Sequence, residues 1–105
     1  MNYQVTFAHE ASNHLAAIRD YIAVAADPVT AERYVDAIID HCLDLEMFPH
    51  RGARRDDLRP GLRTVNFRKR VTIAFAVDDV ANRVTILGVF YGGLDIDTAF
   101  APDGV

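Results

Sequence analysis

Residues 71–91 read VTIAFAVDDVANRVTILGVFY, and the architecture of the chain follows from this stretch. Large apolar side chains alternate with smaller ones over residues 71–77, which is the period of a β-strand. Polar turn residues occupy 78–83, and a second apolar run over 84–91 predicts an antiparallel hairpin. Alternation places Leu87 and Val89 on the second face of that run. Because both faces are then apolar, we expect this strand to lie inside the sheet.

The N-terminal part of the chain predicts one strand and one helix. Apolar residues at every second position mark a half-buried strand; they are Tyr3, Val5 and Phe7. From Leu15 to Ala25 the apolar residues recur at helical intervals. Ala8 and His9 mark the start of this helix poorly, because neither is a good capping residue.

A second helix begins at Asp27-Pro28. Asp27 can accept hydrogen bonds from free backbone N–H groups, and Pro28 suits the first helical position because it has no N–H to satisfy. Apolar residues continue at helical spacing over residues 31–45, and Pro49 and Gly52 are expected to end the helix. An acidic row on another face of this helix, which we expect to be solvated, consists of Asp36, Asp40 and Asp44.

The predicted elements define a fold class. A fourth strand is predicted over residues 62–67, with Val65 and Phe67 on one face. The linker between the helices is short, so the helices should form an antiparallel hairpin. The order β-α-α-β-β-β therefore predicts an α+β fold of two layers, with the helical hairpin on one face of a mostly antiparallel sheet. We expect residues 1–105 to form one domain, with a short tail over about 95–105.

Positive charge is concentrated in one window of an acidic protein. The formal net charge of the chain is −4, but residues 51–70 carry a local charge of +6. Eight of the eleven basic residues lie there, and ten of the eleven are arginine. This segregation suits an anionic partner, because the planar guanidinium donates two hydrogen bonds at once to a carboxylate. The overall acidity argues against nucleic-acid binding as the dominant activity, and we expect no sequence-specific contact with nucleic acid.

Composition excludes several classes of protein. The apolar runs are too short to cross a bilayer, and the N-terminus lacks a secretory signal pattern, so we expect a cytoplasmic protein. A single cysteine, Cys42, allows no internal disulfide and is predicted to be a buried apolar residue. The histidines show no metal-binding spacing, and we expect neither a metal nor a cofactor.

The order and spacing of several motifs resemble the RelE/ParE superfamily of bacterial type II toxins, and its ParE branch in particular. The motifs are Phe48-Pro49-His50-Arg51-Gly52, Arg59-Pro60-Gly61-Leu62-Arg63, Arg70-Val71-Thr72-Ile73-Ala74-Phe75, and the run from Val84 to Gly93. The resemblance extends from Tyr3 to about Asp95, which is nearly the whole chain. It implies a toxin that a cognate ParD-like antitoxin neutralises. The ParE branch implies inhibition of DNA gyrase, whereas RelE-type members cut messenger RNA on the ribosome.

The resemblance and the charge pattern together indicate residues that bind the antitoxin or the target. These are Arg51, Arg54, Arg55, Arg59, Arg63, Arg68, Lys69, Arg70 and Tyr91. An antitoxin segment is expected to be acidic and to fold onto the toxin as it binds. Arg19, Arg33 and the acidic tail over residues 95–100 are further possible target contacts.

An RNA-cleaving toxin needs a base, a cation and an acid around the reacting phosphate. Arg68 and Arg70 could neutralise that phosphate, and Tyr91 could donate a proton. The four histidines all lie in the N-terminal half of the chain, and Gly92-Gly93 follows Tyr91 without a reactive side chain. We therefore predict no catalytic residue and no enzyme. The ribonuclease is the runner-up interpretation, and a neutral member that forms a complex without toxicity is the third.

Overall fold

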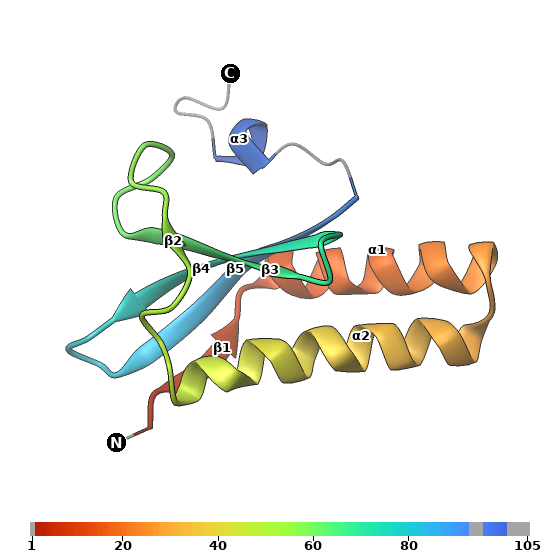
Figure 1. Ribbon diagram of the computed structural model, residues 1–105, viewed down its shortest axis with the longest axis horizontal. Coiled ribbons are helices and arrows are strands. Elements are labelled where there is room, and N and C mark those ends of the chain that lie inside the picture. Colours follow the sequence, from red (N-terminus) through yellow and green to blue (C-terminus); the bar gives the residue numbers. More distant parts are fainter. Residues whose placement is uncertain (1, 93–95, 101–105) are drawn as a thin grey trace.

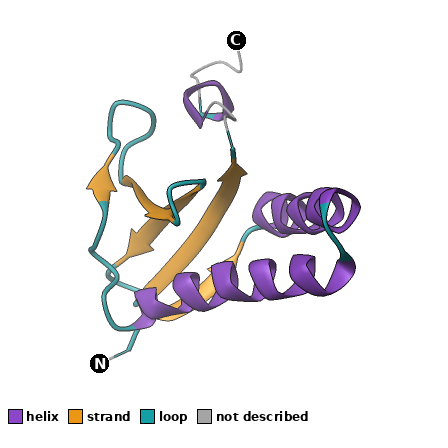
Figure 2. Cartoon of the chain, turned by 45° about the vertical axis from the view of Figure 1, so that its right-hand side comes forward, coloured by secondary structure: helices purple, strands orange, loops and turns teal. Residues whose placement is uncertain are grey.

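A computed structural model describes residues 2–92 and 96–100 of the chain (Figure 1). Five strands form one sheet: β1 (Gln4–Phe7), β2 (Ala53–Arg54), β3 (Leu62–Phe67), β4 (Val71–Asp78) and β5 (Arg83–Tyr91). The helices are α1 (His9–Ala25), α2 (Pro28–Leu43), a 3₁₀ turn η1 (Asp44–Glu46) and α3 (Ile96–Ala99). Figure 2 shows α1 and α2 as an antiparallel pair against one face of the sheet, with α3 near the far end of β5.

The sheet confirms the predicted α+β architecture and adds one strand to it. The strand order is β1-β5-β4-β3-β2, so β5 lies inside the sheet as predicted. β1 runs parallel to β5, and the other pairs are antiparallel. β2 was missed in the sequence because a two-residue strand, exposed at both positions, has no alternation to detect. The four-residue α3 was missed for the same reason of length.

The start of α2 is as predicted. The Asp27 carboxylate accepts hydrogen bonds from the Thr30 backbone N–H and the Thr30 hydroxyl, both at 2.8 Å. These bonds, that of the backbone first, lower the pKa of Asp27. At the start of α1 the capping position is Ala8, which makes no side-chain capping bond.

The end of α2 differs from the prediction. The α-helix ends at Leu43, and η1 then tightens the chain before Pro49 and Gly52 are reached. The apolar spacing continued to Leu45 because that side chain is fully buried from within the 3₁₀ turn. Burial pattern alone does not separate the two helix types. Gly52 instead makes a positive-φ turn, with φ +86°, that leads into the sheet.

The core lies between the helical hairpin and the sheet. Both helices bury one stripe against β4 and β5, where Phe75 and Ile86 are fully buried. Cys42 belongs to this core, and burial raises the pKa of its thiol to about 12. The prediction of a buried cysteine in the apolar core is therefore confirmed.

A β-bulge in β5 corrects the prediction for Val89. Ala74 of β4 pairs with Gly88 and Phe75 pairs with Ile86, so Leu87 has no partner in the register. The extra residue inverts the alternation beyond it. Val89 consequently packs into the helix-facing core, whereas Leu87 packs against the cluster on the second face. The same inversion turns Tyr91 toward the helices.

Candidate functional site

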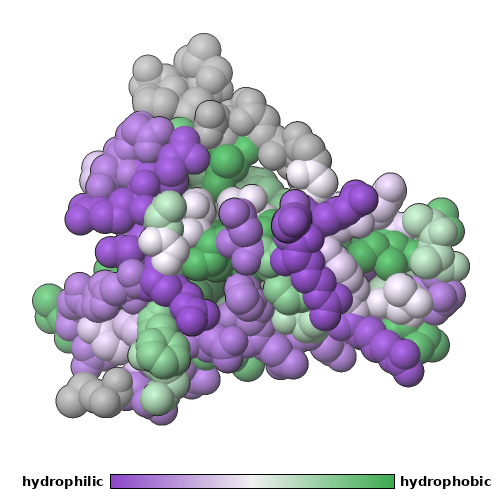
Figure 3. Space-filling view, in the orientation of Figure 1, coloured by the Kyte–Doolittle hydropathy of each residue, from purple (hydrophilic) through white to green (hydrophobic). Residues whose placement is uncertain are grey.

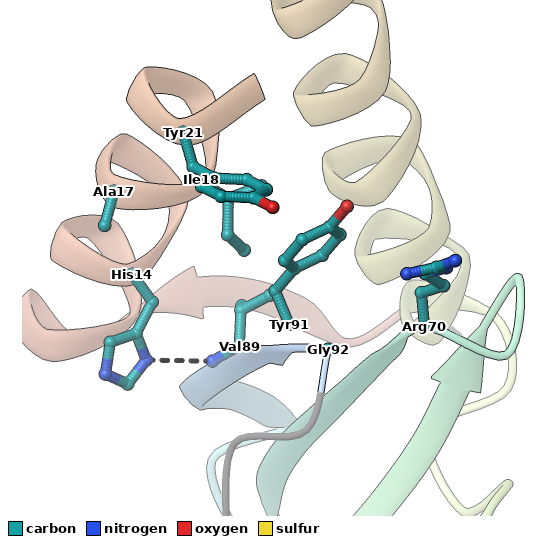
Figure 4. Close-up of a pocket in the computed structure, with 8 residues that line it drawn as sticks. All are labelled: His14, Ala17, Ile18, Tyr21, Arg70, Val89, Tyr91 and Gly92. Carbon is teal, nitrogen blue, oxygen red and sulfur yellow. Dashed lines mark hydrogen bonds between the residues drawn. The ribbon is translucent and has the colours of Figure 1, made fainter. Parts of the chain in front are cut away.

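A groove of about 420 Å³ opens between α1 and the end of β5 (Figure 4). The bulge forms one of its walls, because it directs Val89 and Tyr91 toward the helices. The α1 wall consists of residues three or four positions apart, which lie on one face of the helix. The lining residues are His14, Ala17, Ile18, Tyr21, Arg70, Val89, Tyr91 and Gly92.

Tyr91 stands in a row of aromatic rings that joins four elements. Its ring centroid lies 5.8 Å from that of Tyr21 on α1 and 5.9 Å from that of Tyr34 on α2. Tyr34 in turn lies 6.0 Å from Phe67 at the end of β3. The rings are tilted or edge-to-face, the geometry that aromatic pairs prefer. This packing does not test the prediction that Tyr91 takes part in a binding surface.

Three cations stand beside this row in the turn between β3 and β4. Arg68 and Lys69 both have positive φ, 51° and 63°. The Arg68 guanidinium lies 4.8 Å from the Phe67 ring centroid and 5.9 Å from that of Tyr34. Within residues 2–92 and 96–100, no ion pair joins Arg68, Lys69 or Arg70 to a carboxylate. These three charges are therefore available to a ligand.

The Tyr34 hydroxyl is influenced by Tyr91, Arg68 and Arg70. Burial raises the pKa of Tyr34, and the neighbouring Tyr91 hydroxyl adds to that rise. The positive charges of Arg68 and Arg70 oppose it. The Tyr34 and Tyr91 ring centroids lie 5.9 Å apart, and the Arg68 guanidinium lies 5.9 Å from the Tyr34 ring centroid. Arg70 lines the groove with Tyr91, so two phenols and two guanidiniums gather near one end of the groove. We call this set, Tyr34, Arg68, Arg70 and Tyr91, the tyrosine–arginine cluster.

His14 reaches the groove from α1, which the sequence reasoning missed. Its Nδ1 accepts a hydrogen bond of 3.0 Å from the Val89 backbone N–H, so the ring proton is on Nε2. One reason for predicting no enzyme was that no histidine lies in the strand segments of the sequence. In the folded chain, however, His14 of α1 lies beside β5. A glycine inside an apolar strand was the available signal, because such a glycine often marks a bulge or a close approach. A Cβ at Gly88 would lie 2.8 Å from the Phe90 ring and 3.3 Å from His14 Cε1.

The other five predicted arginines lie at the opposite end of β3. Arg54 pairs with Asp56 and Arg55 pairs with Asp57, each at 3.0 Å. The Gly61 backbone N–H, with help from Arg54, lowers the pKa of Asp56. Figure 3 shows hydrophilic side chains over the loop between β2 and β3 and over the β3–β4 turn, with more apolar side chains between them. The basic window of the sequence is therefore two surfaces in space.

Arg51, Arg59 and Arg63 complete that second surface. The Arg51 guanidinium lies 5.3 Å from the centroid of the exposed Phe48 ring. Arg63 donates a 2.8 Å hydrogen bond to the His50 carbonyl. Arg59 lines a second pocket, of about 370 Å³, together with Phe90 and with Ala99 of α3.

A polar cluster joins the N-terminus to this same end of the sheet. Asp79 accepts hydrogen bonds from the Tyr3 hydroxyl at 2.6 Å and from His50 Nε2 at 2.8 Å. These bonds, led by that of Tyr3, lower the pKa of Asp79, and the same contact raises the pKa of Tyr3. The cluster is exposed and fixes loops to one another.

The remaining predicted contacts are scattered. Arg19 lies 3.2 Å from Glu32 as part of the pairing of α1 with α2. Arg33 is exposed on α2. Residues 93–95 lie outside the described residues; they include Gly93 of the predicted strand end and Asp95, the first residue of the acidic tail. In the described part of the chain, no three potential metal ligands gather, and no helix is long and apolar enough to span a bilayer.

The described lining of the groove carries positive charge. Among the described residues that line it none is a carboxylate, and His14 Nδ1 accepts a hydrogen bond from the backbone. The tyrosine–arginine cluster adds several hydrogen-bond donors with positive charge beside them.

Comparison with known proteins gives one family. The model of the family described as the ParE toxin of the type II toxin–antitoxin system parDE matches residues 5–95. A search of curated proteins found no match to the sequence.

Solved structures share the fold. A chain of the chromosomal ParDE system of P. aeruginosa is 24% identical with a TM-score of 0.74, over 86% of this chain and 96% of that one. A chain of the RelBE2 toxin–antitoxin complex of Mycobacterium tuberculosis is 21% identical with a TM-score of 0.64, over 87% of this chain and 99% of that one. A mutant E. coli RelE toxin in the free state is 12% identical with a TM-score of 0.66, over 96% of this chain and 95% of that one. At these identities the likeness shows the fold.

Proposed function

The chain belongs to the ParE toxin family of type II toxin–antitoxin systems, and we propose that it inhibits DNA gyrase by binding. No covalent bond is broken in this proposal. The protein acts in the bacterial cytoplasm, and a cognate ParD-like antitoxin neutralises it.

The observation that carries the proposal is that, in the described part of the chain, the cations around the groove are unpaired and the aromatic rings beside them are packed together. Arg68, Lys69 and Arg70 have no carboxylate partner within the described residues, while the nearby aromatic rings are packed against one another. A surface of packed aromatic rings and arginines is typical of residues that dominate protein–protein binding. Proton transfer, in contrast, would need a base with a free lone pair, and the groove-lining His14 uses Nδ1 as an acceptor.

The antitoxin contact is supported by charge. A segment rich in carboxylates matches arginines through bidentate hydrogen bonds. Two arginine surfaces are available, one at each end of β3. The ParDE and RelBE2 structures that share this fold are toxin–antitoxin systems by description, which supports a partner of this kind here.

Expression in bacteria tests the proposal. Induction without an antitoxin should cause filamentation and a DNA-damage response while translation continues. Co-expression of the neighbouring open reading frame should restore growth if that frame encodes a ribbon-helix-helix antitoxin. Rapid loss of translation without DNA damage would contradict the proposal.

A ribosome-dependent ribonuclease is the second candidate, and one observation favours it. His14, Arg70 and Tyr91 line the same groove, so an imidazole, a guanidinium and a phenol share one space. In this alternative Arg68 and Arg70 would stabilise the phosphate charge and Tyr91 would donate the proton. Cleaved transcripts in the induced cells would identify this activity. A complete absence of growth inhibition would instead identify a neutral complex-forming member.

A further inference from the structure

We propose that the groove and the tyrosine–arginine cluster together bind a nucleoside phosphate. The base would occupy the groove, and the phosphate would lie against Arg68, Arg70 and the hydroxyls of Tyr34 and Tyr91. This inference goes beyond gyrase inhibition and does not depend on it. The nucleoside phosphate could be a free nucleotide or the phosphorylated end of a strand.

The number of donors favours a phosphate over a carboxylate. The Tyr34 and Tyr91 hydroxyls have no hydrogen-bond partner among the described residues, and neither guanidinium has a carboxylate partner there. Two guanidiniums and two phenols offer more donors than the two oxygens of a carboxylate can use. A phosphate monoester has three terminal oxygens and a charge near −2, so it can use them.

The groove suits a flat, partly polar ring. Its volume of about 420 Å³ falls in the range of small-molecule sites. Ala17, Ile18 and Val89 provide apolar walls, and the Tyr21 side chain, 61% exposed, leaves a ring available for stacking. The His14 Nε2–H is a donor that the protein does not use elsewhere, within the residues described. Figure 4 shows Tyr21 and Tyr91 at one side of this space and His14 at the other.

The β3–β4 turn holds the cations in place before a ligand arrives. Two consecutive positive-φ residues in a hairpin turn normally favour Asn and Gly, because other side chains are strained there. Arg68 and Lys69 occupy those positions, and Arg68 folds back over Phe67 and Tyr34. Strain of this kind is often found at ligand sites. A guanidinium already held by two rings loses less freedom on binding.

Titration of the purified chain with adenosine 5′-monophosphate tests the proposal. We expect saturable binding by calorimetry, with NMR shifts at the Val89 amide and the Tyr21 ring. Adenosine alone and inorganic phosphate alone should each bind about tenfold more weakly or worse, because each fills half of the site. A short oligodeoxyadenylate, with and without a 5′-phosphate, separates the two sources. Tighter binding of the 5′-phosphorylated strand than of the mononucleotide would identify a strand end.

Variants locate the site. The double substitution Arg68→Gln with Arg70→Gln should weaken nucleotide binding about tenfold or more while leaving the weak binding of adenosine unchanged. Tyr21→Ala should weaken adenosine and nucleotide alike. The control is Arg83→Gln, which removes a positive charge at the other end of β5, away from the groove, and should bind as the parent does. Circular dichroism of each variant verifies the fold.

Three results would overturn the proposal. The first is no binding of the mononucleotide or of either strand at millimolar concentration. The second is equal weakening by the control variant Arg83→Gln, which would mean non-specific attraction to charge. The third is tight binding of an oligoglutamate peptide at this site with no nucleotide binding, which would assign the cluster to an acidic protein segment.

Discussion

Substitutions of Tyr91 can distinguish a binding role from a catalytic one. Its ring packs between Tyr21 and Tyr34, with centroid distances of 5.8 and 5.9 Å. If the ring matters through packing, Tyr91→Phe should reduce growth inhibition by less than about twofold, and Tyr91→Ala should reduce it far more. Survival of cells after induction measures this. Complete loss of toxicity in the Phe variant would indicate that the hydroxyl donates a proton.

Gly88 is required by its surroundings rather than by its backbone angles. A Cβ at this position would lie 2.8 Å from the Phe90 ring. Gly88→Ala should therefore lower the free energy of unfolding by about 1–3 kcal/mol, the usual effect of overpacking. Urea denaturation measures the change. The same substitution in a Phe90→Leu background should be less harmful, and a change below about 0.5 kcal/mol in the parent would contradict the account.

Asp79 makes stability depend on pH in a predictable direction. Its folded-state pKa lies below the ordinary value of 3.8, mainly because of the Tyr3 hydroxyl. The stabilisation from the carboxylate is therefore present above that ordinary value and is lost as the pH falls through the folded pKa. Asp79→Asn should lower the melting temperature at neutral pH, and the difference from the parent should shrink in acid. A difference independent of pH would show that the charge plays no part.

At the scale of elements, α2 shows what local sequence can specify. Asp27 caps the helix with two hydrogen bonds to Thr30. Asp27→Ala should lower the melting temperature because it leaves helix N–H groups without a partner. Asp36→Ala, an exposed change in the middle of the same helix, is the matched control and should have little effect. Equal effects of the two substitutions would argue against the cap.

The elements that could be predicted are those with a regular period. Both long helices and the strands β1, β3, β4 and β5 follow from apolar spacing, and the inner position of β5 follows from its two apolar faces. The two-residue β2 has too short a pattern. The bulge at Leu87 could not be deduced because strict alternation assumes that no residue is inserted. That one insertion moved Val89 to the other face.

The site was harder to predict than the fold because it depends on the bulge. Arg68, Arg70 and Tyr91 were named from the sequence, and the structure places them near one another. His14, Tyr21 and Tyr34 were missed, since helix residues far away in the chain meet β5 once the sheet is assembled. Arg54 and Arg55 were named on the same ground, their positive charge. In the structure, however, each is paired with an aspartate two residues further along the chain.

At the scale of the whole molecule, charge is divided between two ends of one strand. β3 separates the turn with Arg68 from the loop with Arg54, and β3 spans six residues, or about 20 Å. The acidic row on α2 lies on a different layer. One end of the molecule can therefore meet the antitoxin while the other end meets a second partner, and the net charge of −4 does not describe either surface.

The most direct test uses the purified chain in two parallel assays, DNA supercoiling by gyrase and cleavage of messenger RNA on translating ribosomes. The account predicts that supercoiling is inhibited, that added antitoxin relieves the inhibition, and that the transcripts stay intact. Cut transcripts with gyrase fully active would contradict it.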